Sequence, residues 1–161
     1  MLKLEEELGK LLKSNELTIA TAESCTGGLI ANLITNISGS SQYFIEGVVS
    51  YSNRSKIDLL NVPAGILKRH GAVSSETAVA MANGIRGVAK SDLGLAITGI
   101  AGPTGGTTKK PVGLVYIAIA SEQNVKPFKF NFKGSRMEIK SQTATKALEI
   151  TIEYLKTRLK N

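Results

Sequence analysis

The chain has one cysteine, one histidine and no tryptophan among its 161 residues. A single cysteine cannot form an internal disulfide, and a single histidine leaves no His/Cys cluster of the kind that binds zinc or an iron centre. We therefore expect chemistry that needs no metal or other cofactor, or chemistry that relies on carboxylates.

Long apolar runs are also missing. Apolar stretches reach about eight residues, well short of the roughly 20 that span a bilayer. The first 13 residues, MLKLEEELGKLLK, are charged throughout and lack the apolar stretch of a secretory signal. We expect a cytoplasmic chain with no membrane segment, and its length predicts one domain over residues 1–161.

Positive charge exceeds negative charge, with a formal net charge of +7, and the excess is uneven. Residues 126–161 carry a net charge of +6, and the rest of the chain carries +1. The stretch KPFKFNFKG in this segment alternates phenylalanine with lysine, so it could stack single-stranded nucleic acid. Burial preferences favour a half-buried strand with solvated lysines instead. We do not expect nucleic acid as a partner.

Hydrophobic periodicity predicts interleaved helices and strands. Such an order is typical of an α/β fold, a three-layer α/β/α sandwich with a central mixed, largely parallel sheet. The expected strands are LTIATA, FIEGVVSYS, LGLAITGI, VGLVYIAIA and VKPFKFNF. The expected helices contain Leu4–Leu12, Leu29–Ile37, Lys56–Leu60, Ala78–Val88 and Ala144–Leu159.

Two glycine-containing loops follow expected strands, where open α/β sheets bind ligands. The first, ESCTGG, precedes a helix whose free N–H groups and dipole would suit an anion or an ionised nucleophile. It could equally be an ordinary helix cap made by Ser24 or Thr26. The second, ITGIAGPTGG, lacks the Lys-Ser/Thr ending of a phosphate-binding P-loop. Two such loops in one small domain favour a site over flexible turns.

Six blocks together carry a family resemblance. They are AESCTGG at 22–28, SGSSQYF at 38–44, VVSYSNRSK at 48–56, HGAVS at 70–74, TGIAGPTGG at 98–106 and KPVG at 110–113. In this order they resemble the CinA C-terminal family, which includes stand-alone PncC-type nicotinamide-nucleotide amidases. The resemblance runs from about residue 5 to the final helix.

The resemblance implies hydrolysis of the carboxamide of nicotinamide mononucleotide, which yields nicotinic acid mononucleotide and ammonia in pyridine-nucleotide salvage. Larger two-domain members carry an additional N-terminal domain linked to pyrophosphatase activity. We do not expect that activity, since 161 residues leave no room for such a domain.

The resemblance also implies a serine acyl-enzyme mechanism. Serine with a desolvated lysine is a recognised nucleophile and base pair. The matching blocks point to Ser41 as nucleophile and Lys56 as base, with Ser24 as the alternative nucleophile.

Further residues are expected to form the pocket: most lie in the same blocks, and Arg136 lies in GSR before the last helix. Ser24, Tyr51 and Thr98 are expected to donate hydrogen bonds to the carboxamide or its tetrahedral intermediate. Arg136 suits the substrate phosphate, because its fork of donors matches phosphate oxygens. The helix start after ESCTGG is the competing phosphate site. The expected substrate-binding residues are Thr26, Gly27, Thr98, Gly99 and Arg136.

Two alternatives stay open at the level of sequence. Cys25, at a helix start, could be a thiolate nucleophile with His70 as its base, although cysteine is more often buried and inert. The chain could also be a binding module for nucleotides or nucleic acid, without catalysis. We also expect a homo-oligomer, since the N-terminal helix and the phenylalanine strand could both pack against a second copy.

Overall fold

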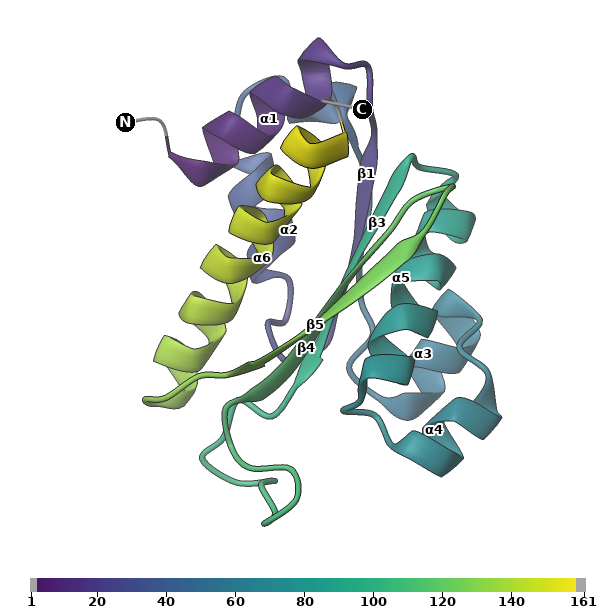
Figure 1. Cartoon of the computed structure of the whole chain (residues 1–161), viewed down its shortest axis with the longest axis vertical. Helices are drawn as coiled ribbons and strands as arrows, with labels where there is room; N and C mark the ends of the chain where they lie inside the picture. Colours follow the sequence, from purple (N-terminus) through teal and green to yellow (C-terminus); the bar gives the residue numbers. More distant parts are fainter. Residues whose placement is uncertain (1–2, 159–161) are drawn as a thin grey trace.

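A five-stranded sheet forms the centre of the computed structural model, which describes residues 3–158 (Figure 1). Its strand order is β2-β1-β3-β4-β5. Strands β2, β1 and β3 are parallel, and β4 runs antiparallel to both of its neighbours. The expected mixed sheet is thus confirmed. The strands are β1 (Ile19–Glu23), β2 (Phe44–Val49), β3 (Leu93–Gly99), β4 (Leu114–Ala120) and β5 (Val125–Asn131).

Helices cover both faces of the sheet, which confirms the three-layer arrangement (Figure 1). One layer holds α1 (Leu4–Ser14), α2 (Leu29–Thr35) and α6 (Arg136–Arg158). The other holds α3 (Asn53–Leu60), α4 (Ala64–His70) and α5 (Ser75–Ala89). A short 3-10 helix, η1 (Ser40–Gln42), lies between α2 and β2 along the chain.

Two helices differ from the expectation. The sequence pattern did not predict α4, because seven residues after Pro63 are too few to show a clear helical period. Helix α6 begins at Arg136, eight residues before the expected apolar pattern at Ala144. Leu159, the last expected position of that pattern, lies outside the described residues. Within residues 3–158, no helix combines the length and apolar character needed to cross a bilayer.

The two faces of the sheet differ in side-chain size, and this sets the spacing of the layers. Leu95 and Ile97 of β3 pack toward α1, α2 and α6, whereas Gly94 and Ala96 face α5. A Cβ at Gly94 would lie 2.2 Å from the carbonyl oxygen of Ala82, so α5 needs a glycine there to pack this closely.

The strand β5 resolves the two interpretations of KPFKFNF. Phe128, Phe130 and Phe132 pack against the core on the α6 side of the sheet, and Lys126 and Lys129 are exposed. This is the half-buried strand that burial preferences predict. Its aromatic rings belong to the core and do not form a stacking surface for bases.

Candidate active site

A cavity of about 270 Å³ opens where the parallel strands β1, β2 and β3 end. Its walls come from the loops after these strands, from Lys56 in α3, from the loop between α4 and α5, and from the start of α6. Six of the expected site residues line it: Ser24, Tyr51, Lys56, Thr98, Gly99 and Arg136. A larger cavity of about 600 Å³ lies among α3, α4 and α5, but Glu76 is the one titratable side chain in its described lining. The smaller cavity is therefore the candidate active site.

Lys56 is the central group of this cavity. Its side chain is buried, with 1% relative exposure. Its Nζ lies 3.1 Å from Ser24 Oγ and 2.7 Å from the backbone carbonyl oxygen of Ser50. In residues 3–158, Lys56 forms no ion pair with a carboxylate. Burial lowers the pKa of the Lys56 amine, which favours the neutral form that a general base needs.

A capping box explains why a lysine side chain enters the cavity from α3. The Ser52 hydroxyl accepts from the Ser55 backbone N–H, and the Ser55 hydroxyl accepts from the Ser52 backbone N–H. These two bonds start the helix immediately after β2 and place Lys56 in its first turn, over the end of the sheet.

Ser41 does not meet Lys56, which corrects the expected nucleophile and base pair. Ser41 is exposed in η1, before β2 begins, whereas Lys56 follows the end of β2. A strand of six residues is roughly 20 Å long, so the two side chains lie near opposite ends of the sheet. The serine that contacts Lys56 is Ser24, the alternative nucleophile.

The helix start after ESCTGG is already occupied by an internal anion. The Glu23 carboxylate, 1% exposed, accepts hydrogen bonds from the backbone N–H groups of Gly28, Ile30 and Ala31, at 3.0, 3.1 and 2.8 Å. This corrects the expectation that an external anion binds here. Gly27 and Gly28 allow the backbone to make this turn, because both have positive φ, of 65° and 95°, which glycine adopts without strain.

Two other expected substrate contacts lie outside the cavity lining. Thr26 is buried, and its hydroxyl has no hydrogen-bond partner in the described residues. Gly27 is exposed and is also absent from the cavity lining. The Glu23 carboxylate holds the first turn of α2, and Ser24 and Cys25 are the residues of this loop in the cavity lining.

Tyr51 and Arg136 meet across the cavity mouth. Arg136 Nη2 donates to the Tyr51 hydroxyl at 3.0 Å, and Arg136 Nη1 donates to the Gly102 carbonyl at 2.9 Å. Both side chains are exposed, so the guanidinium remains accessible to a ligand. The arginine thereby links the loop after β2 to the glycine-rich loop after β3.

Thr98 has a positioning contact instead of the expected donor role. Its hydroxyl donates to the Ala72 carbonyl at 2.7 Å and so holds the loop before α5 against the cavity. Gly99 beside it has no room for a side chain, because a Cβ would lie 2.7 Å from Val115 Cγ2.

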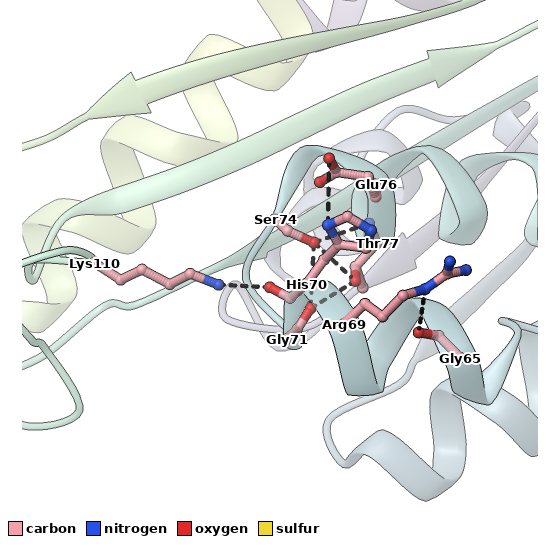
Figure 2. Close-up of polar contacts among 8 residues, drawn as sticks. All are labelled: Gly65, Arg69, His70, Gly71, Ser74, Glu76, Thr77 and Lys110. Carbon is pink, nitrogen blue, oxygen red and sulfur yellow. Dashed lines mark hydrogen bonds and ion pairs between the residues drawn. The ribbon is translucent and has the colours of Figure 1, made fainter.

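The loop between α4 and α5 is held by a polar cluster (Figure 2). The Ser74 hydroxyl caps α5 by accepting from the Thr77 backbone N–H, and the Thr77 hydroxyl donates to the Gly71 carbonyl. Lys110, from the glycine-rich loop, donates to the His70 carbonyl at 2.7 Å. The Lys110 bond joins the glycine-rich loop to the end of α4, next to the loop before α5, and both loops contribute residues to the cavity lining.

The cysteine alternative is not assembled in the structure. Cys25 is 6% exposed, and burial raises the pKa of its thiol to about 12, so the thiol is neutral. The His70 side chain points to Glu76, with Nδ1 3.5 Å from a carboxylate oxygen, and it does not line the cavity (Figure 2).

Two functional candidates were missed in the sequence. Ser50 orients the Lys56 amine through its backbone carbonyl, which no side-chain pattern reveals. Lys140 lies one helical turn after Arg136, and a Cβ at Gly27 would be 3.6 Å from its Nζ. A capping-box signature, Ser135 with Glu138, marks the true start of α6 and could have placed Lys140 beside Arg136.

Metal-ligating side chains are dispersed. Among residues 3–158, no group of three or more His, Cys, Asp or Glu side chains is placed to hold a metal ion.

Comparisons with known proteins agree with the resemblance. A family model described as "CinA C-terminal domain" matches residues 1–155. A "CinA-like protein" of Citrifermentans bemidjiense is 51% identical over 156 residues, which are 97% of this chain and 38% of that protein. A "CinA-like protein" of Geotalea daltonii is 55% identical over 138 residues, which are 86% of this chain and 33% of that protein. The matched part of this chain therefore spans about a third of the length of these relatives.

Solved structures agree as well. The competence/damage inducible protein CihA of Agrobacterium tumefaciens has a TM-score of 0.88 at 40% identity, covering 95% of this chain and 96% of that one. The competence damage-inducible protein A of Klebsiella pneumoniae has a TM-score of 0.92 at 31% identity, covering 94% of each chain. The family model over residues 1–155, the relatives and the solved structures agree, and the chain belongs to the CinA C-terminal domain family.

Proposed function

We propose that this chain is an amidohydrolase that converts nicotinamide mononucleotide to nicotinic acid mononucleotide and ammonia through a serine acyl-enzyme. The observation that carries the proposal is the buried, carboxylate-free Lys56 amine beside the Ser24 hydroxyl in an open cavity. Burying a lone ammonium is unfavourable, and a neutral amine there is a base within reach of a hydroxyl proton.

The first step forms the acyl-enzyme. One N–H of the neutral Lys56 amine donates to the Ser50 carbonyl, which directs the nitrogen lone pair toward Ser24 Oγ. Lys56 takes the Ser24 proton as the oxygen attacks the carboxamide carbon, which the cationic pyridinium ring makes electrophilic. The amine then returns this proton to the departing nitrogen, and ammonia leaves.

The second step reverses these roles. Water enters the place of ammonia, Lys56 accepts a proton from it, and the resulting hydroxide attacks the ester carbon. The proton passes back to Ser24 Oγ as the bond from serine to the acyl carbon breaks. Nicotinic acid mononucleotide is released and the enzyme regains its starting protonation state.

Tyr51 is suited to stabilise the oxyanion of both tetrahedral intermediates. Its oxygen accepts from Arg136, so its own proton stays free for the developing negative charge, and the adjacent guanidinium strengthens it as a donor. The backbone N–H groups of Ala101 and Gly102, in the cavity wall, donate to no other described residue and can assist.

The substrate phosphate fits the cationic start of α6. Arg136 and Lys140 occupy its first two turns, where the helix dipole disfavours positive charge, so an anion between them would relieve an unfavourable arrangement. We assign the phosphate to these two side chains, since Glu23 already occupies the N-terminus of α2.

The test is direct. Purified chain is incubated with nicotinamide mononucleotide, and both nicotinic acid mononucleotide and ammonia are quantified, with free nicotinamide and a chelator as controls. We expect chelator-resistant turnover that is restricted to the nucleotide. Binding of the nucleotide without turnover would instead identify a sensor, and steeply salt-dependent DNA retention a nucleic-acid module.

A further inference from the structure

Another cavity, of about 230 Å³, lies at the amino ends of β1 and β2. It is formed by α1 on one side and by residues 37–39 and Tyr43 on the other. Ser38, Gly39 and Tyr43 belong to the SGSSQYF block, which contributes no residue to the candidate active site. The length of strand β2, roughly 20 Å, separates this cavity from the candidate active site.

Tyr43 supplies a buried donor in this cavity. The side chain is 3% exposed, and its hydroxyl has no hydrogen-bond partner in the described part of the chain. Burial raises the pKa of the Tyr43 phenol, so the group stays protonated at neutral pH. Buried hydroxyls are nearly always paired, and one that is not needs an explanation.

Gly9 of α1 makes room for this hydroxyl. A Cβ at Gly9 would lie 2.6 Å from the Tyr43 oxygen, closer than real Cβ contacts. Glycine within a helix is unfavourable relative to alanine. Two locally unfavourable features, an interior glycine and an unpaired hydroxyl, therefore coincide at the cavity wall.

Two cations line the same cavity as Tyr43. Lys10 and Lys13 line the cavity, both are exposed, and neither forms an ion pair within residues 3–158. Glu6 is the one acidic side chain in the described lining. Ile37 gives the cavity an apolar wall. The net charge of the lining is positive, and its hydrogen-bonding side chains are mainly donors.

We propose that this cavity binds a small organic anion, a carboxylate or a phosphate monoester with an apolar body. Its oxygen accepts the Tyr43 hydroxyl, its charge lies between Lys10 and Lys13, and its apolar part contacts Ile37. The volume is below the roughly 300–1,000 Å³ of pockets for drug-sized ligands, which limits the body to one ring or a short chain. A buried water that satisfies Tyr43 is the competing occupant.

The experiment is an NMR titration of the full ¹⁵N-labelled chain with benzoate, phenyl phosphate and neutral benzyl alcohol. We expect saturable shifts of the Gly9 and Gly39 amide signals with at least one anion and none with the alcohol. The tighter of the two anions identifies the headgroup. Absence of saturable shifts at millimolar concentrations of both anions, or equal binding of the alcohol, overturns the proposal.

Variants test the assigned contacts. Tyr43→Phe removes an unpaired hydroxyl, so the chain should fold, and anion affinity should fall at least tenfold; Tyr116→Phe, on the opposite face of the sheet, should not change it. Lys10→Gln with Lys13→Gln should weaken binding, unlike Lys68→Gln with Lys90→Gln at the exposed surface of the other layer. Undiminished affinity in Tyr43→Phe, with higher thermal stability, would point to a water site and overturn the proposal.

Discussion

The Nζ of Lys56 lies 3.1 Å from Oγ of Ser24, although 32 positions separate the two residues along the chain. The contact joins the loop after β1 to the first turn of α3, and it places a base beside a hydroxyl in the candidate active site. The chemistry proposed for the chain depends on this pair.

Replacing the serine tests the nucleophile. We expect Ser24→Ala to lower kcat by roughly 10³-fold or more, as removal of a catalytic serine does, while calorimetry still detects binding of nicotinamide mononucleotide. The matched control is Ser41→Ala, an exposed serine at the other end of β2. Loss of activity in Ser41→Ala but not in Ser24→Ala would restore the original assignment.

The pH profile tests the base. Lys56 accepts a proton only when neutral, so kcat/KM should rise with pH and level off above its pKa. Because burial lowers this pKa, the plateau should begin at a lower pH than an exposed lysine would allow. Lys56→Met should abolish turnover, and a wild-type profile that falls over the same range would contradict the assignment.

The same lysine should reduce the stability of the fold. Its pKa is lower in the folded than in the unfolded chain, so the unfolded state binds more protons between the two values, and stability rises with pH across that window. In Lys56→Met, position 56 carries no titratable group. We expect it to be more stable than wild type in urea unfolding at neutral pH, with the difference shrinking as pH rises. An equal or lower unfolding free energy at neutral pH would indicate that folding does not lower the pKa of Lys56.

Lys140 should determine the preference for a phosphorylated substrate. Lys140→Gln removes a hydrogen bond to a charged group, worth about 1.5–3 kcal/mol, so KM for nicotinamide mononucleotide should rise about 10- to 100-fold. Hydrolysis of nicotinamide riboside, which has no phosphate, should not change. Lys146→Gln, further along α6, is the matched control. An equal loss with both substrates would show that Lys140 does not act on the phosphate.

Cys25 should be dispensable. Its thiol has a pKa raised to about 12 by burial, so Cys25→Ala should keep most of the activity, and iodoacetamide should react slowly at neutral pH. Mass spectrometry measures the alkylation. Rapid alkylation accompanied by inactivation would favour the cysteine as nucleophile.

Glu23 should stabilise the turn that carries Ser24. Its carboxylate accepts three backbone N–H groups at the start of α2, and Glu23→Gln leaves one acceptor oxygen and no charge. We expect a loss of about 1–3 kcal/mol in the free energy of unfolding. Glu122→Gln, at an exposed position, should be neutral. Equal unfolding midpoints in urea for both variants would contradict this role.

The order of the strands and of the longer helices follows from the sequence alone, as do the two glycine-containing loops at the candidate site. Apolar periodicity reports burial locally, and glycines report backbone turns, so neither depends on distant residues. Helix α4 and the first turns of α6 were missed because one is too short to show a period and the others are mostly polar.

Which serine contacts Lys56 depends on the tertiary structure. Ser41 is closer to the lysine along the chain, but β2 lies between them and carries them to opposite ends of the sheet. Ser24 follows β1, which runs parallel to β2, so the segments after these two strands leave the sheet at the same edge. Whether a serine lies near Lys56 depends on the direction of the strand beside it. The number of residues between the two along the chain does not reveal this.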